Sequence, residues 1–128
     1  MPNTDLQSRA AIVRAMFAAV DGRDAEGLIG FLTDDIVLVF AHNAPVEGKQ
    51  AFDTTNRQFM SAIGGIRHEI HDLWQAAEDP DVVIARMTVH YTRLDGSGIS
   101  LPCCNAFRMR GDLIADYRVY MDINPVFA

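Results

Sequence analysis

The sequence contains few positive charges. Among 128 residues, 11 are Lys or Arg and 17 are Asp or Glu, which gives a formal net charge of -6. Proteins that bind DNA or RNA cluster Lys and Arg against the phosphates. Here the Arg residues are scattered and Lys49 is the single lysine. We therefore expect no nucleic-acid partner.

Long apolar runs are also missing. The apolar stretches are short and are interrupted by Asp, Arg or Gly, whereas a membrane-spanning helix needs about 20 apolar residues. Residues 1–5 lack the basic start and apolar run of a secretion signal. We expect a soluble, cytoplasmic protein without membrane contact.

The two cysteines, Cys103 and Cys104, are adjacent in the sequence. Neighbouring strand residues point to opposite faces, so these thiols do not suit a disulfide or a shared zinc ion. No CxxC or HExxH pattern is present. His68 and His71 are three apart on an expected strand and should also face opposite ways, as surface or interface residues. We expect no metal and no cofactor.

A chain of this length fits one domain, which we place over residues 1–128. Apolar residues spaced three and four apart predict a helix over residues 5–20, and a short second helix carries Leu28, Ile29, Phe31 and Leu32. β-branched and aromatic residues predict a strand at 36–40, and a third helix is expected over 50–63. Short Gly, Pro and Asp clusters then separate four expected strands, which form an antiparallel meander: residues 67–77, 82–94, 99–109 and 113–121.

Four segments carry a family resemblance: residues 31–37, 45–52, 105–109 and 114–122. They resemble, in order, the helix-to-strand junction, the proline-glycine start of the third helix and the last two strands of the nuclear transport factor 2-like superfamily, in its SnoaL-like and ketosteroid-isomerase-like branch. The resemblance implies a cone-shaped, cystatin-like α+β fold. In it, three N-terminal helices pack on a curved antiparallel sheet and enclose a cavity, and a homodimer often forms on the outer face of the sheet.

The superfamily hosts several chemistries, so the residues must decide between them. Ketosteroid isomerases use an Asp base with a Tyr and a protonated Asp that hold the oxyanion. The matching positions here are Phe40, Met16 and Asn105. Asn105 can still donate a hydrogen bond to an oxyanion, but the base is absent. The resemblance therefore does not extend to classical steroid isomerisation.

Limonene-type epoxide hydrolases resemble this fold as well, and use an Asp-Arg-Asp trio with a Tyr and an Asn. Arg86 matches the arginine of the trio, while Thr88, Val119, Leu38 and Phe40 fall at the other four positions. One match does not support epoxide hydrolysis.

SnoaL-type cyclases need only one carboxylate or imidazole to take a proton from the substrate. His42 lies two residues after Phe40, on the same face of the expected strand, and could reach the cavity mouth. Asp122, at the end of the last expected strand, is a second candidate base. Each also has a plain structural explanation: an exposed loop histidine, or a carboxylate paired with an arginine.

Alternation predicts which side chains face the cavity. With Asn105 facing inward, the wall is mostly apolar, with one amide and one phenol, and suits an apolar or aromatic ligand with one or two oxygens. Burying the amide is costly unless something satisfies it; a structural hydrogen bond within the protein is the alternative. The expected wall consists of Leu101, Cys103, Asn105, Phe107, Met109, Tyr117, Val119 and Met121.

Further residues are candidates for ligand contacts, and several of them have alternative interpretations. Met16, Phe40 and Phe59 are candidates for the lining, and Trp74 either packs or lines the pocket. Arg86 and His90 share a polar strand face that is either a ligand contact, the outer sheet surface or a dimer interface. The opposite, apolar face of that strand is compatible with a buried dimer sheet or a solvated surface. It carries Val83, Ala85, Met87, Val89 and Tyr91.

Three functions follow as hypotheses. The first is a cofactor-independent isomerase or cyclase that transfers a proton on a small apolar or polycyclic carbonyl compound, with Asn105 polarising the oxygen and His42 or Asp122 as base. The second is a noncatalytic ligand-binding or dimeric interaction domain. The third is a dehydratase that uses His42 or His90 with Tyr117. All three expect a small hydrophobic ligand.

Overall fold

The computed structural model describes the backbone of residues 4–128 and the side chains of residues 9–128. Four helices and six strands follow one another in the order helix, helix, two strands, helix, four strands, helix. Their bounds are α1 (Thr4–Asp21), α2 (Ala25–Ile29), β1 (Leu32–Phe40), β2 (Val46–Glu47), α3 (Lys49–Ser61), β3 (Gly65–Gln75), β4 (Val82–Thr92), β5 (Gly98–Arg110), β6 (Leu113–Tyr120) and α4 (Asn124–Phe127).

The strands form one curved sheet in the order β2-β1-β6-β5-β4-β3. The expected meander from β3 to β6 is present, and every pairing within it is antiparallel. The expectation of a wholly antiparallel sheet is wrong, because β1 pairs parallel with β6, with Phe40 opposite Val119. After α3 the chain enters the sheet at β3, the edge strand farthest from β1 and β2. The meander then runs back toward β1, so β6 is the strand that pairs with β1, and the two run in the same direction.

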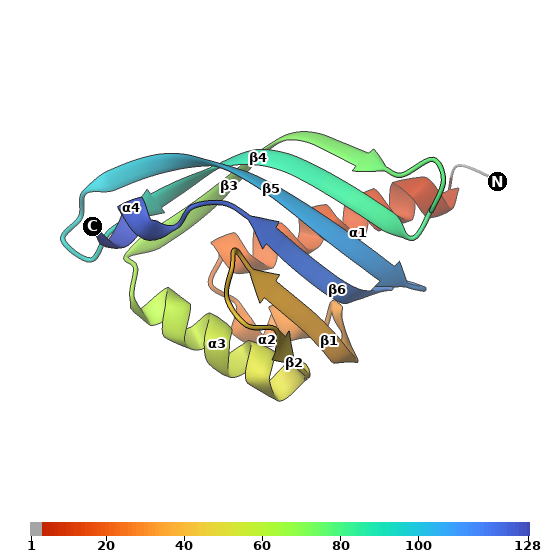
Figure 1. The fold of residues 1–128 in the computed structure, drawn as a ribbon, viewed down its shortest axis with the longest axis horizontal. Helices are drawn as coiled ribbons and strands as arrows, with labels where there is room; N and C mark the ends of the chain where they lie inside the picture. The colour runs from red at the N-terminus through yellow and green to blue at the C-terminus, as the bar shows by residue number, and fades with distance from the viewer. Residues whose placement is uncertain (1–3) are drawn as a thin grey trace.

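The helices cover the concave face of this sheet. Figure 1 shows the long bent strands β3, β4 and β5 arching over α1, while α3 lies beneath, near β2. α1 contacts β3, α3 contacts β1, and α2 lies between α1 and α3. Among the described helices, none is long and apolar enough to cross a membrane.

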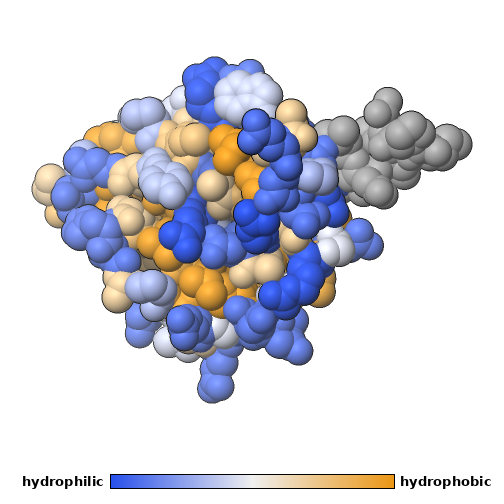
Figure 2. All heavy atoms as spheres, turned by 45° about the vertical axis from the view of Figure 1, so that its right-hand side comes forward, coloured by the Kyte–Doolittle hydropathy of each residue, from blue (hydrophilic) through white to orange (hydrophobic). Residues whose placement is uncertain are grey.

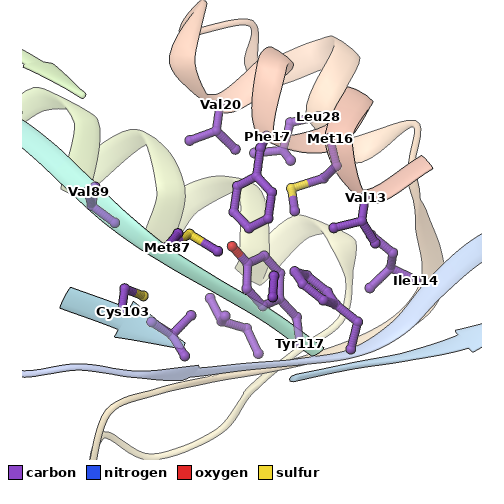
Figure 3. Packing of buried hydrophobic residues seen from close by; sticks show 14 of the residues in the cluster. Val13, Met16, Phe17, Val20, Leu28, Met87, Val89, Cys103, Ile114 and Tyr117 are labelled. Atoms are coloured by element: carbon purple, nitrogen blue, oxygen red, sulfur yellow. The ribbon is translucent and has the colours of Figure 1, made fainter. Parts of the chain in front are cut away.

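The core lies between α1 and the inward face of the sheet. Val83, Ala85, Met87, Val89 and Tyr91 are at most 4% exposed. The expectation of a dimer or solvated surface on this face is wrong. The sheet curves around the helices, so the face packs against helices of its own chain. Figure 3 shows side chains of α1 pointing into the same cluster.

Two local details differ from the sequence-based expectation. The second helix is α2, which ends at Ile29, so Leu32 begins β1 instead of closing the helix. Asp24 caps α2 by accepting the Gly27 N–H at 2.9 Å, which fixes the start of the helix. The strand β2 and the short C-terminal α4 were not expected from the sequence.

On the face seen in Figure 2, apolar side chains form several groups between polar and charged ones. Scattered apolar residues of this kind are normal on a protein surface.

Gly64, which joins α3 to β3, lies close to the end of β4. Its N–H donates to the Thr92 carbonyl at 2.7 Å, and an added Cβ would lie 2.8 Å from the Arg93 carbonyl oxygen. Because that oxygen belongs to the backbone, we predict that Gly64→Ala lowers the free energy of unfolding by about 1–3 kcal/mol, the usual cost of overpacking. Gly98→Ala is the control, since its Cβ would lie 3.6 Å from the Tyr91 carbonyl oxygen. Equal stability of the two variants in urea unfolding would contradict this close contact.

Candidate functional site

A cavity of about 290 Å³ lies between the concave face of the sheet, the end of α1, α3 and the C-terminal residues. Most of its lining is apolar. Among the described residues, no Lys, Arg, Asp or Glu side chain lines it. The polar lining side chains are Asn43, Thr55, Asn56, His68, Tyr91, Cys103, Asn105 and Tyr117.

One wall of the cavity carries a buried amide and a buried phenol. Asn105, on β5, is 1% exposed, and its Nδ2 donates to the Tyr117 hydroxyl at 3.4 Å. Its Oδ1 accepts from the Cys103 thiol at 3.2 Å. Burial, and next the nearby Cys103 thiol, raise the pKa of Tyr117 far above its ordinary value. The phenol therefore stays protonated. Figure 3 shows the Tyr117 ring rising from the sheet toward Phe17 of α1.

The cavity also contains an imidazole held by a carboxylate. Asp21 is the last residue of α1. Its Oδ1 lies 2.6 Å from Nδ1 of His68, and its Oδ2 accepts the His68 backbone N–H at 2.9 Å. The His68 side chain is 8% exposed, lines the cavity, and packs against Phe17 with ring centroids 4.6 Å apart.

The expectation that His68 lies at the surface is wrong. His68 shares the inward face of β3 with Ile66 and Ile70, whereas His71 is exposed and bonds the Thr88 hydroxyl at 2.8 Å. The prediction that the two histidines face opposite ways is confirmed. The signal was present in the sequence: His68 alternates with the apolar Ile66 and Ile70, whereas Arg67 and Glu69 lie on the other face.

The two bases favoured by the sequence lie elsewhere. His42 is exposed in the loop after β1, and neither it nor Asp122 lines the cavity. Ala41 has a φ of 54°, which ends the strand alternation directly after Phe40. Asp122 is exposed and accepts the Asn124 N–H at 3.0 Å, in the turn that leads into α4.

The expected ligand contacts divide into three groups. Phe40, Phe59, Cys103, Tyr117 and Val119 line the cavity together with Asn105. Met16 and Phe107 are fully buried in the core and do not line it.

The remaining three expected contacts lie outside the cavity. Trp74 is half exposed. On the outer face of the sheet, Arg86 pairs with Asp72, and His90 bonds Glu69 at 2.8 Å and Ser100 at 2.7 Å. In the described part of the chain, no group of three or more His, Cys, Asp or Glu side chains could hold a metal ion.

Comparisons with known proteins agree with this architecture. The family model described as a SnoaL-like domain matches residues 13–117. No curated protein matches the chain. Among solved structures, a ketosteroid-isomerase-like protein from Catenulispora acidiphila, in complex with trimethylamine, is 20% identical over 90% of this chain and 88% of its own, with a TM-score of 0.80.

Two further solved structures are similar at low identity. A putative SnoaL-like polyketide cyclase from Jannaschia is 14% identical over 94% of this chain and 90% of its own, with a TM-score of 0.81. The protein RV0760c from Mycobacterium tuberculosis, in complex with estradiol-17beta-hemisuccinate, is 16% identical over 91% and 95%, with a TM-score of 0.79. At such identities these likenesses show the fold.

The two thiols should react at very different rates. Burial, and next the neighbouring Cys104, raise the pKa of Cys103 to about 12, while Cys104 is only half-buried on the other strand face. Since thiolates are the reactive form, we predict that Cys103 reacts at least about 100-fold more slowly than an ordinary thiol in a native-state titration with a disulfide reagent. Cys104→Ser should remove the fast phase. A fast phase that survives this substitution would contradict the enclosed position of Cys103.

Proposed function

The chain belongs to the SnoaL-like domain family, and we propose that it binds a small apolar carbonyl compound in its cavity and transfers a proton on it without a cofactor, as an isomerase or cyclase. One observation carries the proposal. A carboxylate-bound imidazole, His68, and an amide-phenol pair, Asn105 and Tyr117, line the same apolar cavity.

The lining favours a compact and uncharged ligand. The volume of about 290 Å³ lies at the lower end of the roughly 300–1,000 Å³ that is usual for ligand sites. With apolar walls and no charged side chain in the described lining, an anionic ligand would lose its hydration without gaining a partner. The ligand oxygen would lie at Asn105 and Tyr117, whose N–H and O–H donors can hold negative charge that develops there. RV0760c, a similar structure, is in complex with estradiol-17beta-hemisuccinate. The apolar ring system of that ligand supports an apolar ligand here, whereas its size and its carboxylate have no counterpart in the compact, uncharged ligand that we propose.

His68 supplies the base. Because Asp21 accepts from Nδ1, the ring carries its proton there and Nε2 keeps a free lone pair toward the cavity, as in other histidine-carboxylate pairs. Nε2 removes a proton from the carbon next to the carbonyl, and the electron pair moves onto the oxygen held by Asn105 and Tyr117. Asp21 stabilises the imidazolium that forms. Return of the proton at another carbon completes an isomerisation, whereas attack of the carbanion on a second carbonyl closes a ring.

A dehydratase is the second candidate, because a histidine and a phenol do converge on one cavity. In this reaction His68 removes the proton next to the carbonyl, and the imidazolium so formed gives that proton to the hydroxyl on the following carbon, which leaves as water. Burial keeps the Tyr117 phenol protonated and disfavours its phenolate, so Tyr117 serves as a hydrogen-bond donor to the substrate and keeps its proton. The histidine is His68 instead of His42 or His90.

A noncatalytic binding domain is favoured by a different observation. Both ends of the Asn105 amide have partners within the protein, Cys103 and Tyr117, so the amide does not need a ligand to satisfy it. The homodimer, the single domain over residues 1–128 and the cytoplasmic location remain predictions from the sequence and the family resemblance.

Exchange of carbon-bound hydrogen tests the proposal directly. Compact neutral ketones and enones are first screened for ligands that raise the melting temperature. NMR in D₂O then measures how fast each bound ketone exchanges the hydrogens next to its carbonyl. We predict that the wild-type protein accelerates this exchange and that His68→Gln slows it at least about 100-fold, the usual contribution of a general base. Asn105→Ala should weaken both binding and exchange.

Asp79→Asn is the matched control, because Asp79 pairs with Arg108 on the surface, away from the cavity. It should leave exchange unchanged. If a ketone binds but His68→Gln exchanges it as fast as the wild type, the noncatalytic function is correct. If wild type forms an absorbing enone from a β-hydroxy ketone, the dehydratase is correct. Lack of stabilisation by any ketone would contradict carbonyl binding altogether.

A further inference from the structure

The cavity contains a second phenol, Tyr91 of β4. Its side chain lines the cavity, and the residue is 4% exposed. Burial, and next the Cys103 thiol, raise the pKa of Tyr91 far above its ordinary value, so the hydroxyl stays a donor. Within the described part of the chain, the hydroxyl bonds the Met121 sulfur alone, at 3.5 Å. A thioether is a weak acceptor, so this buried O–H is poorly satisfied.

The other buried polar groups of the lining hold better partners. Asn105 donates to the Tyr117 hydroxyl at 3.4 Å and accepts from the Cys103 thiol at 3.2 Å. The His68 ring lies 2.6 Å from an Asp21 carboxylate oxygen. These side chains therefore each have a nitrogen or oxygen partner, which the Tyr91 hydroxyl lacks.

Three further polar side chains of the lining, those of Asn43, Thr55 and Asn56, lie on its open side. Asn43 is exposed, and Thr55 and Asn56 are half-buried, so water can reach them while a ligand is bound. The buried Tyr91 hydroxyl is different. A ligand that fills the cavity displaces water from it and leaves it with the thioether, unless the ligand itself supplies an acceptor.

The two phenols of the cavity lie at different positions along α3. The Tyr117 ring packs against Phe52, with ring centroids 6.4 Å apart, and the Tyr91 ring packs against Phe59, with ring centroids 6.3 Å apart. Phe59 follows Phe52 by two helical turns, a rise of about 10 Å. One ligand that contacts both phenols must therefore carry its two acceptors at opposite ends of its skeleton.

We propose that Tyr91 binds a second oxygen of the ligand, and that the ligand is a compact apolar carbonyl compound with another neutral acceptor oxygen at its far end. The proposal rests on the proposed function, which places the first oxygen at Asn105 and Tyr117. The second oxygen belongs to a carbonyl, hydroxyl or ether, because the described lining has no charged partner for a carboxylate. Tyr91 does not touch the reacting carbonyl. It selects which compounds bind and takes no part in the proton transfer.

Two ketones with the same ring system test this site. They are 2-decalone, with one carbonyl, and decalin-2,6-dione, with a second carbonyl at the far end. Isothermal titration calorimetry measures the Kd of each for the wild type and for Tyr91→Phe. The wild type should bind the dione at least as tightly as the monoketone. Tyr91→Phe should weaken dione binding roughly three- to tenfold, the usual effect of one neutral hydrogen bond, and leave the Kd of the monoketone within about twofold.

Tyr120→Phe is the matched control, because Tyr120 is an exposed phenol of β6 outside the cavity lining. The same loss of a hydroxyl there should change neither Kd. Tyr117→Phe should instead weaken both ketones, since both carry the first oxygen. Equal weakening of both ketones by Tyr91→Phe would mean that Tyr91 only shapes the cavity, and an unchanged Kd of the dione would place its second oxygen elsewhere. Either result overturns the proposal.

Hydrogen exchange separates this proposal from the proposed function. Bound 2-decalone should exchange the hydrogens next to its carbonyl at close to the wild-type rate in Tyr91→Phe, and far more slowly in His68→Gln. If the wild type binds and exchanges 2-decalone but rejects the dione, the second-oxygen site is wrong and the proposed function stands. If the wild type binds neither ketone, the site of the first oxygen fails as well.

Discussion

The pair of hydrogen bonds between Asp21 and His68 determines what the cavity can do. A carboxylate at the C-terminal end of a helix is disfavoured by the helix dipole, and α1 has no basic residue in its last turn. Two N–H groups of one residue compensate: the backbone N–H of His68 and its ring Nδ1–H, at 2.9 and 2.6 Å from the two carboxylate oxygens. The same contact ties the end of α1 to β3 and orients the imidazole at the cavity wall.

Burial keeps the hydrogen-bond donors of the cavity uncharged. Burial raises the pKa values of Tyr117, Tyr91 and Cys103, so the two phenols and the thiol stay neutral donors. The carboxylate lies behind the imidazole and not in the lining. Neutral donors on one wall and an oriented imidazole on the other suit a reaction in which charge appears only transiently, as when a proton leaves a carbon next to a carbonyl. The arrangement does not suit a permanently charged ligand.

The inward face of β5 was predictable from alternation, and so was that of β6 from Tyr117 onward. Cys103, Asn105, Tyr117, Val119 and Met121 of the expected wall line the cavity, whereas Leu101, Phe107 and Met109 do not. Cys103, Asn105 and Phe107 are buried while their neighbours are less so, and the period of two places them on one face. The position of the base was only partly predictable. His42 follows Ala41, whose positive φ breaks the alternation. His68 alternates with Ile66 and Ile70, which places it on their face, but its contacts with Asp21 and Phe17 of α1 are long-range. No local pattern encodes the long-range contacts. One is the parallel pairing of β1 with β6. Another is the binding of the Pro125 and Val126 carbonyls by Arg93, which lies 32 and 33 residues away in the sequence.

The central claim is that His68 is the histidine that meets the ligand, and histidine side-chain NMR tests it most directly. With ¹⁵N-labelled imidazoles, titration with a ketone that stabilises the protein should move the Nε2 resonance of His68. The resonances of His42, His71 and His90, which lie outside the cavity lining, should stay in place. Such a result would locate ligand and base in one cavity. A shift of the Nε2 resonance of His42 or His90, with no change in that of His68, would contradict the account. The ligand would then bind at the loop after β1 or on the outer face of the sheet.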